Sequence, residues 1–478
     1  MNNYYITTTL PYVNSNPHIG FASEIIRADV LARFNRDVLG REVFFNTGTD
    51  EHGQKIYDQA QERKMSAQEF CDLQVKDFKD LKKSLNLSLN NFIRTTDENH
   101  IKAAQEFWKI CEKNGDIYKA KYKIKYCVGC ELEKTDSELN NKGRCSLHPN
   151  KDLQIVEEEN YFFKFSNYQQ ALLDFYEKNP NFVEPNKRFG EIKKFVEKDL
   201  KDFSISRLKI KMPWGVPVPG DDNQVMYVWF DALVNYISVL GWPLNQDNFD
   251  KWWPGNQIAG KDNLRQQSAM WQAMLMSAGL PNSRKIYING FIISDGQKMS
   301  KSLGNVISPL EMVKKFGIDG TRYLLMGSAS FGEDVDLTWE RMIERYNNDL
   351  ANGLGNVFSR VVKLSQKIEL SDQEIADYID SNIDLNLEKY QEYFEQGRVE
   401  KLLQDTQKKV SEIDKRIEEI KPWEISKTKP EKFQEEMLGF LVKLAEIKEM
   451  IEIFMPETAE KMGVMLSSRE TQGLFPRI

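Results

Sequence analysis

Apolar positions recur with two different periods between the N-terminus and about residue 115. Positions at helical spacing predict an amphipathic helix over 20–38, which ends at Gly40. Ser66 and Glu69 have the spacing of a capping box and predict the start of a further helix. Short apolar runs predict strands over 4–10, 42–47 and 91–96. Such alternation of strands and helices indicates a parallel sheet, which binds ligands at the carboxyl ends of its strands.

The pattern changes near residue 117. Lysines alternate with apolar or aromatic residues over 118–126, as in a half-exposed strand. The strand–helix alternation resumes near Val225 and includes an apolar run that predicts one strand over 285–293. The segment before Val225 is therefore predicted to be an insertion into a nucleotide-binding fold. After Trp339 the chain has helical periodicity and dense mixed charge, which predicts a helical bundle. The predicted segments are 1–116 and 225–326 for the two halves of the α/β domain, 117–224 for the insertion, 327–345 for a linker and 346–478 for the bundle.

Length and charge restrict the class of protein. A chain of 478 residues is too long for one core, so about two to four domains are expected. The chain has no apolar run of about 18 residues, and its N-terminus lacks a charged stretch followed by an apolar one, so neither a membrane span nor export is expected. A net charge of −7 argues against a protein that coats nucleic acid indiscriminately, so a nucleic-acid partner would need local basic patches.

Three of the five cysteines lie close together in the sequence with a histidine. They form a CxxC pair and a CxxH pair, separated by fourteen residues, at Cys127, Cys130, Cys145 and His148. This spacing lets four side chains meet on one tetrahedral ion, and it predicts a closed, structural Zn²⁺ site. The other two cysteines stand singly, so no disulfide framework is expected and a reducing cytoplasm fits best.

Two segments supply the chemistry that a triphosphate needs. Residues 298–302 read Lys-Met-Ser-Lys-Ser, and Lys298 and Lys301 can neutralise charge that develops on phosphoryl oxygens. Residues 17–20 read Pro-His-Ile-Gly and open the predicted helix, whose N-terminal amides can bind phosphate. Taken alone, His18 would be a capping or core residue. Together, the two segments indicate an ATP site.

These two segments resemble the signatures of class I aminoacyl-tRNA synthetases. Further segments narrow the resemblance to the methionyl-tRNA synthetase family, and they lie at 9–14, 48–53, 227–233, 260–262 and 350–356. The resemblance implies an α/β class I Rossmann-like catalytic domain, an inserted zinc-knuckle connective domain and a C-terminal all-α anticodon-binding bundle, with a linker that contacts the tRNA stem.

The resemblance also implies an activity. The protein would be a cytoplasmic ligase that adenylates L-methionine with ATP and Mg²⁺, and then transfers it to the terminal adenosine of tRNA(Met). The chain up to Ile478 lacks the extra domain that dimerises some relatives, so a monomer is expected.

The resemblance assigns roles to individual residues. Methionine would be bound by Leu10, Tyr12, Asp50, Trp229, Ala232 and Tyr236. ATP would be bound by Pro17, His18, Gly20, Phe21, Gly260, Asp262, Asn289, Lys298 and Lys301. The catalytic residues would be His18, Lys298 and Lys301, and the anticodon-binding residues Asn356, Arg360 and Trp423. Asp50 suits the α-ammonium group, and aromatic side chains suit the thioether. Trp423 alone fits a bundle core equally well, and Lys261, beside the ribose-binding pair, is left without a role.

The sequence departs from the family at three positions. Phe21 stands where the first signature usually has a second histidine, and a phenyl ring cannot donate to phosphate. Asn14 or Asn16 could compensate. Gln267 and Asn289 stand where the family often has histidine, and both can still form hydrogen bonds.

Two alternatives therefore stay open. One is a catalytically weakened or silent paralogue that binds methionine or tRNA. The other is a different class I enzyme, such as the cysteine enzyme, whose zinc binds substrate. The insertion is too short for the editing domain of the isoleucine, valine and leucine enzymes.

Overall fold

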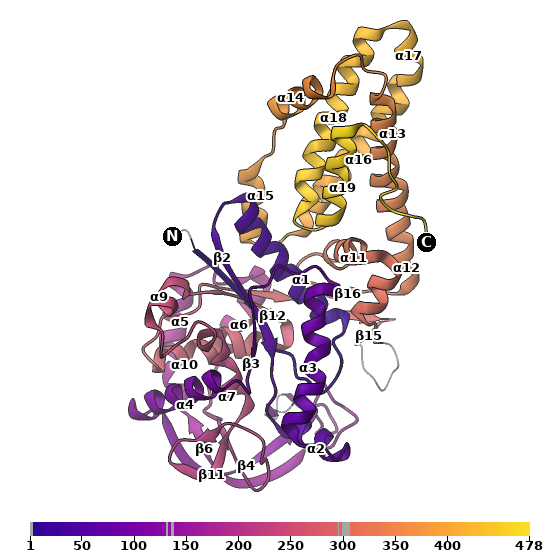
Figure 1. Cartoon of the computed structure of the whole chain (residues 1–478). Coiled ribbons are helices and arrows are strands. Elements are labelled where there is room, and N and C mark those ends of the chain that lie inside the picture. The colour runs from indigo at the N-terminus through magenta and orange to yellow at the C-terminus, as the bar shows by residue number, and fades with distance from the viewer. Residues whose placement is uncertain (1–2, 131, 135–137, 295, 299–305) are drawn as a thin grey trace.

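The computed structural model describes residues 3–130, 132–134, 138–294, 296–298 and 306–478. A six-stranded parallel sheet lies at the centre of the α/β part (Figure 1). From edge to edge, its strands are β3 (Asn91–Arg94), β2 (Glu42–Thr49), β1 (Asn3–Thr8), β12 (Asn256–Gly260), β13 (Lys285–Asn289) and β7 (Val183–Glu184). Because all these pairs are parallel, the carboxyl ends of the strands meet at one edge. The predicted parallel sheet is confirmed.

The first helices form where the sequence predicts them. α1 (Ile19–Arg33) continues into a π-helical turn at Phe34–Val38, which matches the helix expected over 20–38. Ser66 and Glu69 form the predicted capping box at the start of α3 (Ala67–Ser84). The other helices of the α/β domain are α2 (Gln54–Glu62), α4 (Glu98–Lys113), α7 (Val228–Leu233), α8 (Asn235–Ser238), α9 (Gln246–Trp252), α10 (Trp271–Ser277) and α11 (Pro309–Gly327).

The apolar run over 285–293 does not form one strand. It is divided at Gly290 into β13 and β14 (Ile292–Ser294), and β14 pairs with β15 (Gln297–Lys298) and β16 (Val335–Asp336). A Cβ atom at Gly290 would lie 2.0 Å from the carbonyl oxygen of Glu333. The two segments thus cross at a distance that only glycine permits, which a local pattern of apolar positions cannot indicate.

The segment predicted to be an insertion forms two small antiparallel sheets. The larger has the order β5 (Leu132–Glu133), β4 (Ile117–Cys127), β6 (Gln154–Phe163), β8 (Phe203–Ser204), and the smaller has the order β10 (Pro217–Val218), β11 (Asp221–Met226), β9 (Ser206–Leu208). The half-exposed strand expected over 118–126 is β4. Helices α5 (Gln169–Lys178) and α6 (Asn186–Glu197) flank β7, which pairs with β13 at the edge of the central sheet. The insertion therefore contributes a strand to the central sheet.

The chain after Trp339 is helical, as predicted, and forms the orange and yellow part of Figure 1. A π-helical segment, Tyr346–Gly355, joins the first two helices. The helices are α12 (Trp339–Arg345), α13 (Asn356–Ser365), α14 (Asp372–Asn382), α15 (Leu387–Glu395), α16 (Glu400–Ile420), α17 (Pro422–Thr428), α18 (Pro430–Glu452) and α19 (Pro456–Ser468). In the parts of the chain that the structure describes, no helix has both the length and the apolar character of a membrane span.

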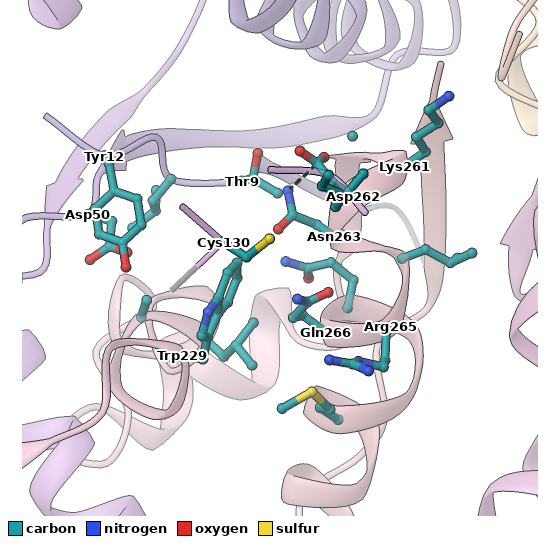
Figure 2. A pocket seen from close by; sticks show the side chains of 18 of the residues that line it. Thr9, Tyr12, Asp50, Cys130, Trp229, Lys261, Asp262, Asn263, Arg265 and Gln266 are labelled. Carbon is teal, nitrogen blue, oxygen red and sulfur yellow. Dashed lines mark hydrogen bonds between the residues drawn. The ribbon is translucent and has the colours of Figure 1, made fainter. Parts of the chain in front are cut away.

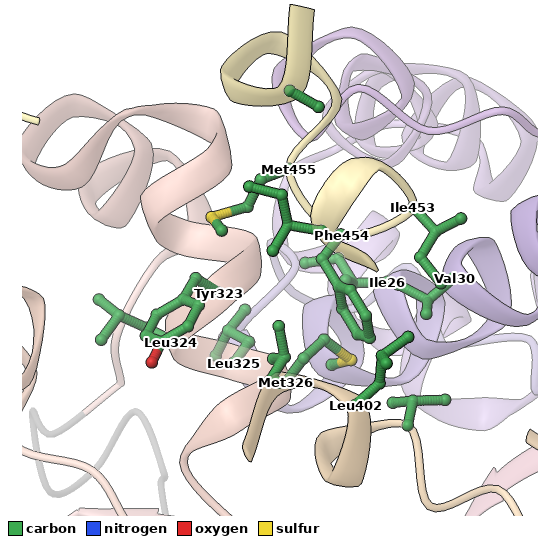
Figure 3. Close-up of a cluster of buried hydrophobic side chains, with 14 of the residues drawn as sticks. Ile26, Val30, Tyr323, Leu324, Leu325, Met326, Leu402, Ile453, Phe454 and Met455 are labelled. Carbon is green, nitrogen blue, oxygen red and sulfur yellow. The ribbon is translucent and has the colours of Figure 1, made fainter. Parts of the chain in front are cut away.

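Buried apolar side chains join α1 to the bundle (Figure 3). Ile26 and Val30 of α1 lie beside Leu325 of α11, Leu402 of α16 and Phe454 in the turn between α18 and α19. All five side chains are buried, so this junction is part of one continuous core. The helix that begins with the first signature is therefore packed against the C-terminal bundle.

Two buried ion pairs cross the same junction. Arg27 of α1 donates to the carbonyl oxygen of Gly397 at 2.8 Å and lies 3.6 Å from Glu400. Asp29, two residues further along α1, accepts a 2.7 Å bond from Arg322, and both side chains are fully buried. Burial alone would raise the pKa of Asp29, but Arg322 and other donors lower it overall, so this carboxyl is ionised.

Candidate functional site

A cavity of about 1420 Å³ opens at the carboxyl ends of the central strands (Figure 2). The predicted methionine residues all line it, namely Leu10, Tyr12, Asp50, Trp229, Ala232 and Tyr236. Most of the predicted ATP residues also line it, namely Pro17, His18, Gly20, Phe21, Gly260, Asp262 and Asn289. In Figure 2, Asp50 and Tyr12 lie on one side, and Lys261 and Asp262 on the other. One cavity thus contains both predicted sites.

The predicted methionine end of the cavity has an aromatic wall on the short helices α7 and α8. Gln267 donates a 2.6 Å bond to the hydroxyl of Tyr236, and burial raises the pKa of Tyr236, so the phenol stays neutral. The indole N–H of Trp229 is buried with no hydrogen-bond partner among the described residues. His52 lies 2.9 Å from Asp231 and fastens α7 to the end of β2. The wall is therefore rigidly held.

Asp50 follows β2 and is 5% exposed. Its N–H donates to the carbonyl of Pro11, and its carbonyl accepts from the N–H of Val13, so the loops after β1 and β2 are joined. A buried carboxylate beside an apolar wall suits a ligand that carries an ammonium group and an apolar side chain.

His18 is the N-cap of α1, and its Nδ1 accepts a 3.0 Å bond from the N–H of Gly20. Because Nδ1 accepts, the proton of the neutral ring lies on Nε2, which can donate. A Cβ atom at Gly20 would lie 2.7 Å from Cε1 of His18. Gly20 was expected to let a nucleotide approach the backbone, and it also makes room for the imidazole. The capping and phosphate-binding roles of His18 are thus compatible.

Phe21 is 8% exposed, and its ring meets Phe78 in an edge contact with centroids 5.9 Å apart. The position that holds a histidine in the family is therefore an apolar part of the cavity wall. Asn14 and Asn16 also line the cavity, and the side-chain nitrogen of Asn289 is buried without a hydrogen-bond partner in the described part of the chain. Amide groups are therefore available in the cavity that Phe21 lines.

Glu24 is a cavity residue that the sequence reasoning missed. Its carboxyl accepts bonds from the N–H and hydroxyl of Thr9. Burial, with a smaller contribution from the charge of Asp262, outweighs the bonds from Thr9 and raises the pKa of Glu24 to about 8. The spacing of Glu24, one turn after Gly20 on α1, could have indicated that it faces the same ligand.

The raised pKa of Glu24 predicts a pH-dependent stability. The carboxyl is favoured in its protonated form in the fold, so its stabilising effect is present below about pH 4.5 and is lost as the pH rises through about 8. We expect the urea midpoint of the native protein to fall over this range relative to that of Glu24→Gln, which cannot ionise. Denaturation of both proteins from pH 5 to 8.5 measures the difference, and parallel curves would contradict the assignment.

The four predicted metal ligands do meet. The ligand atoms of Cys127, Cys130, Cys145 and His148 all lie within 4.8 Å of one another. The sulfur of Cys130 is 3.1 Å from Nδ1 of His148, and a Cβ atom at Gly129 would lie 2.4 Å from the same ring. This donor set and its compactness fit a tetrahedral metal ion.

The metal cluster is also a wall of the cavity. Gly129, Cys130 and His148 line it, and the Lys55 ammonium donates a 3.1 Å bond to the carbonyl oxygen of Gly129. The site was predicted to be purely structural. Its position shows that the fold of the knuckle also shapes the ligand cavity.

The predicted lysine loop is described in part. Lys298 lies in β15, where it pairs with Ile293 of β14. Lys301 lies outside the described residues, together with the other residues from 299 to 305. The role of both lysines stays a prediction.

The three predicted anticodon residues lie in the bundle. Asn356 and Arg360 are one turn apart on α13, and Trp423 lies on α17. Arg360 donates to Asp414 at 2.8 Å and to Glu418 at 2.6 Å, so its charge is already paired. Trp423 is 41% exposed, which excludes the alternative of a bundle-core residue.

Known proteins resemble this chain over its whole length. The family model described as tRNA synthetases class I (M) matches residues 4–148 and 132–362. Methionine–tRNA ligase of Thermotoga maritima is 41% identical over 98% of this chain and 76% of its own length, and that of Rickettsia bellii is 39% identical over 100% and 95%. The solved structure of Mycobacterium tuberculosis methionyl-tRNA synthetase in complex with methionyl-adenylate has a TM-score of 0.89 at 32% identity, with 100% of both chains covered. The chain therefore belongs to the methionine–tRNA ligases, a family of class I tRNA synthetases.

Proposed function

We propose that this chain activates L-methionine with ATP and then transfers the methionyl group to the terminal adenosine of tRNA(Met). The relatives named methionine–tRNA ligase and the structural neighbour that holds methionyl-adenylate support this function. The single observation that carries it is that one cavity brings an ammonium-binding carboxylate and an aromatic wall together with a helix N-terminus.

The first step forms a mixed anhydride. A carboxylate oxygen of methionine attacks the α-phosphorus of ATP, the bond to the β-phosphate bridging oxygen breaks, and pyrophosphate leaves. In the second step a ribose hydroxyl of the terminal adenosine attacks the carbonyl carbon, and AMP leaves. Neither step needs a protein nucleophile, so catalysis rests on positioning and on stabilisation of charge.

Different residues of the cavity bind different parts of the two substrates. Asp50 binds the α-ammonium, while the wall of Trp229, Ala232 and Tyr236, with Leu10 and Tyr12, encloses the thioether. Gly260 and Asp262 receive the ribose, and a Cβ atom at Gly260 would lie 2.7 Å from the Asp262 carboxylate, so the glycine makes room for it. Phosphate oxygens receive hydrogen bonds from Nε2 of His18 and the first amides of α1. Lys298, Lys301 and Asn289 are the further ATP ligands that the family resemblance implies.

Two metal ions belong to this proposal. Mg²⁺ would accompany ATP and neutralise part of the triphosphate charge. Zn²⁺ would be held by the three thiolates and one imidazole of the knuckle, with all four positions filled by protein, so it would support the fold without binding substrate.

The bundle would hold the anticodon. Asn356 and Arg360 present polar groups on one helix face, and the exposed Trp423 offers a ring on which an unpaired base can stack. The proposal also includes the segment bounds predicted from the sequence. It further includes a monomeric state and a cytoplasmic location. All five cysteines lie in the described part of the chain and none of them forms a disulfide, which fits a reducing compartment.

Methionine-dependent exchange of labelled pyrophosphate into ATP tests the function. We expect clear exchange by the native protein, no exchange with cysteine or isoleucine, and a similar or higher rate for Phe21→His. If the native protein shows no exchange but Phe21→His does, the chain would instead be a binding paralogue that Phe21 has made catalytically inactive. The absence of exchange with both proteins would contradict the assignment of the site.

Removing the metal tests the structural role of the knuckle. A strong chelator, or Cys130→Ser, should increase protease cleavage within 117–224 and raise the KM for methionine severalfold, because the knuckle forms a wall of the cavity. Cys111→Ala, which removes a buried thiol outside the knuckle, is the matched control and should change neither. Complete loss of methionine binding on chelation would indicate an ion that binds substrate, as in the cysteine enzyme.

A further inference from the structure

Lys261 lies between Gly260 and Asp262, yet its charge is not directed to the nucleotide site. Its Nζ lies 2.8 and 2.6 Å from the two carboxylate oxygens of Asp334, seventy-three residues later. Figure 2 shows the side chain directed away from Asp262, at the edge of the cavity that it lines. The ammonium is therefore held by the segment that precedes β16.

Asp334 joins three segments at one point. Its Oδ1 also accepts a 2.9 Å bond from the N–H of Phe291, and the Lys261 ammonium lies 4.1 Å from the centroid of the Phe291 ring. Burial opposes ionisation of Asp334, but the bonds from Lys261 and from the Phe291 amide outweigh it and lower the pKa of this carboxyl. The close crossing of Gly290 and Glu333 lies beside these contacts.

This point connects the ribose end of the cavity to the base of the lysine loop. On one side, Lys261 is the direct neighbour of Gly260 and Asp262. On the other side, Asp334 directly precedes β16, and β16 pairs with β14 in a parallel arrangement. β14 also forms an antiparallel pair with β15, which contains Lys298. The ion pair therefore fixes the end of β12 relative to the small sheet from which the loop begins.

We propose that Lys261 and Asp334 are positioning residues, which lock the ribose-binding end of β12 to the strand that carries Lys298. This inference rests on the proposed function and adds a geometric constraint to it. When the pair is intact, the ribose and the triphosphate are held at the separation that in-line attack requires. When it is broken, ATP binding weakens while methionine binding is retained.

A set of variants tests the proposal by pyrophosphate exchange. Lys261→Met and Asp334→Asn each remove the ion pair, and the amide introduced by Asp334→Asn keeps an oxygen that can accept from the Phe291 N–H. The pair is partly exposed, 23% and 41%, so each variant should raise the KM for ATP roughly 3- to 10-fold and leave the KM for methionine unchanged. The double variant should be no worse than either single variant, because both remove the same interaction.

Glu333→Gln is the matched control. Glu333 precedes Asp334 and pairs with Lys187 at 3.0 Å, an ion pair that does not include the ribose strand. This variant should leave both KM values unchanged. An equal rise of the KM for ATP in Glu333→Gln would overturn the proposal, because it would show general loosening of the segment.

Opposite effects of Lys261→Met and Asp334→Asn on the KM for ATP would also overturn the proposal. If Lys261 binds phosphate directly, Lys261→Met weakens ATP binding, whereas Asp334→Asn frees the ammonium and leaves the KM for ATP unchanged or lower. If the native protein shows no methionine-dependent exchange, the proposed function fails. Equilibrium dialysis of labelled ATP with the same variants then still tests the ion pair, with the same order of affinities expected.

Discussion

Replacing His18 with asparagine is expected to lower kcat for pyrophosphate exchange about 100- to 1000-fold, because one preorganised donor to phosphate is lost. Nδ1 of His18 is engaged by the N–H of Gly20, so only Nε2 can serve this function. The effect should appear in kcat more than in the KM for methionine, since the methionine wall is untouched. Steady-state exchange kinetics measure it.

The choice of asparagine separates catalysis from helix capping. Asparagine is a good N-cap, so His18→Asn should leave the urea midpoint of the protein unchanged. His18→Ala loses both functions and should destabilise α1 by about 1 kcal/mol as well as slow the reaction. If His18→Asn were as active as the native protein while His18→Ala were slow, the imidazole would be only a cap.

Replacing Arg322 with methionine is expected to destabilise the protein by about 3–5 kcal/mol, because it leaves a buried carboxylate without its main partner. Arg322 is fully buried and donates to Asp29, and its other bonds go to the carbonyl oxygens of Leu85 at 3.0 Å, Ile453 at 3.1 Å and Phe454 at 2.6 Å. The substitution removes the donor from the Asp29 carboxylate and from the three carbonyl oxygens at the same time. A fall of the urea midpoint measures the loss.

Two comparisons make this second prediction specific. Arg416→Met removes ion pairs to Glu436 and Glu419 on the bundle surface, where the guanidinium is 43% exposed, and should cost about 1 kcal/mol or less. Asp29→Asn combined with Arg322→Met should cost less than the sum of the two single changes, since the double variant has no buried carboxylate that depends on Arg33 and Ser88 alone. Strict additivity would mean that the two residues do not act as a pair.

The local elements were predictable from the sequence because their signals are local. The capping box at Ser66 and the alternation over 118–126 each depend on residues a few positions apart, and both are confirmed. The run over 285–293 was misjudged because its division at Gly290 depends on Glu333, which approaches from a distant segment.

The candidate site was predictable to the extent that its residues lie in motifs. The resemblance placed His18, Asp50 and Trp229 in one site, and the structure brings all three to one cavity. It did not indicate Glu24, whose raised pKa arises from burial rather than from any sequence signal. It also gave no role for Lys261, because the partner of that residue is not a neighbour in any motif.

By itself, the sequence determined the order of strands and helices, the cluster of three cysteines and one histidine, and the residues predicted to bind methionine and ATP, most of which line one cavity. Only the tertiary structure decided that the knuckle is a wall of the cavity, that Lys261 pairs with Asp334, and that Arg322 joins α1 to the bundle. The physical reason is the range of the interactions. Periodicity and ligand spacing act over a few residues, whereas the Asp29–Arg322 bond joins positions 293 residues apart, and its strength depends on a burial that only the complete fold creates.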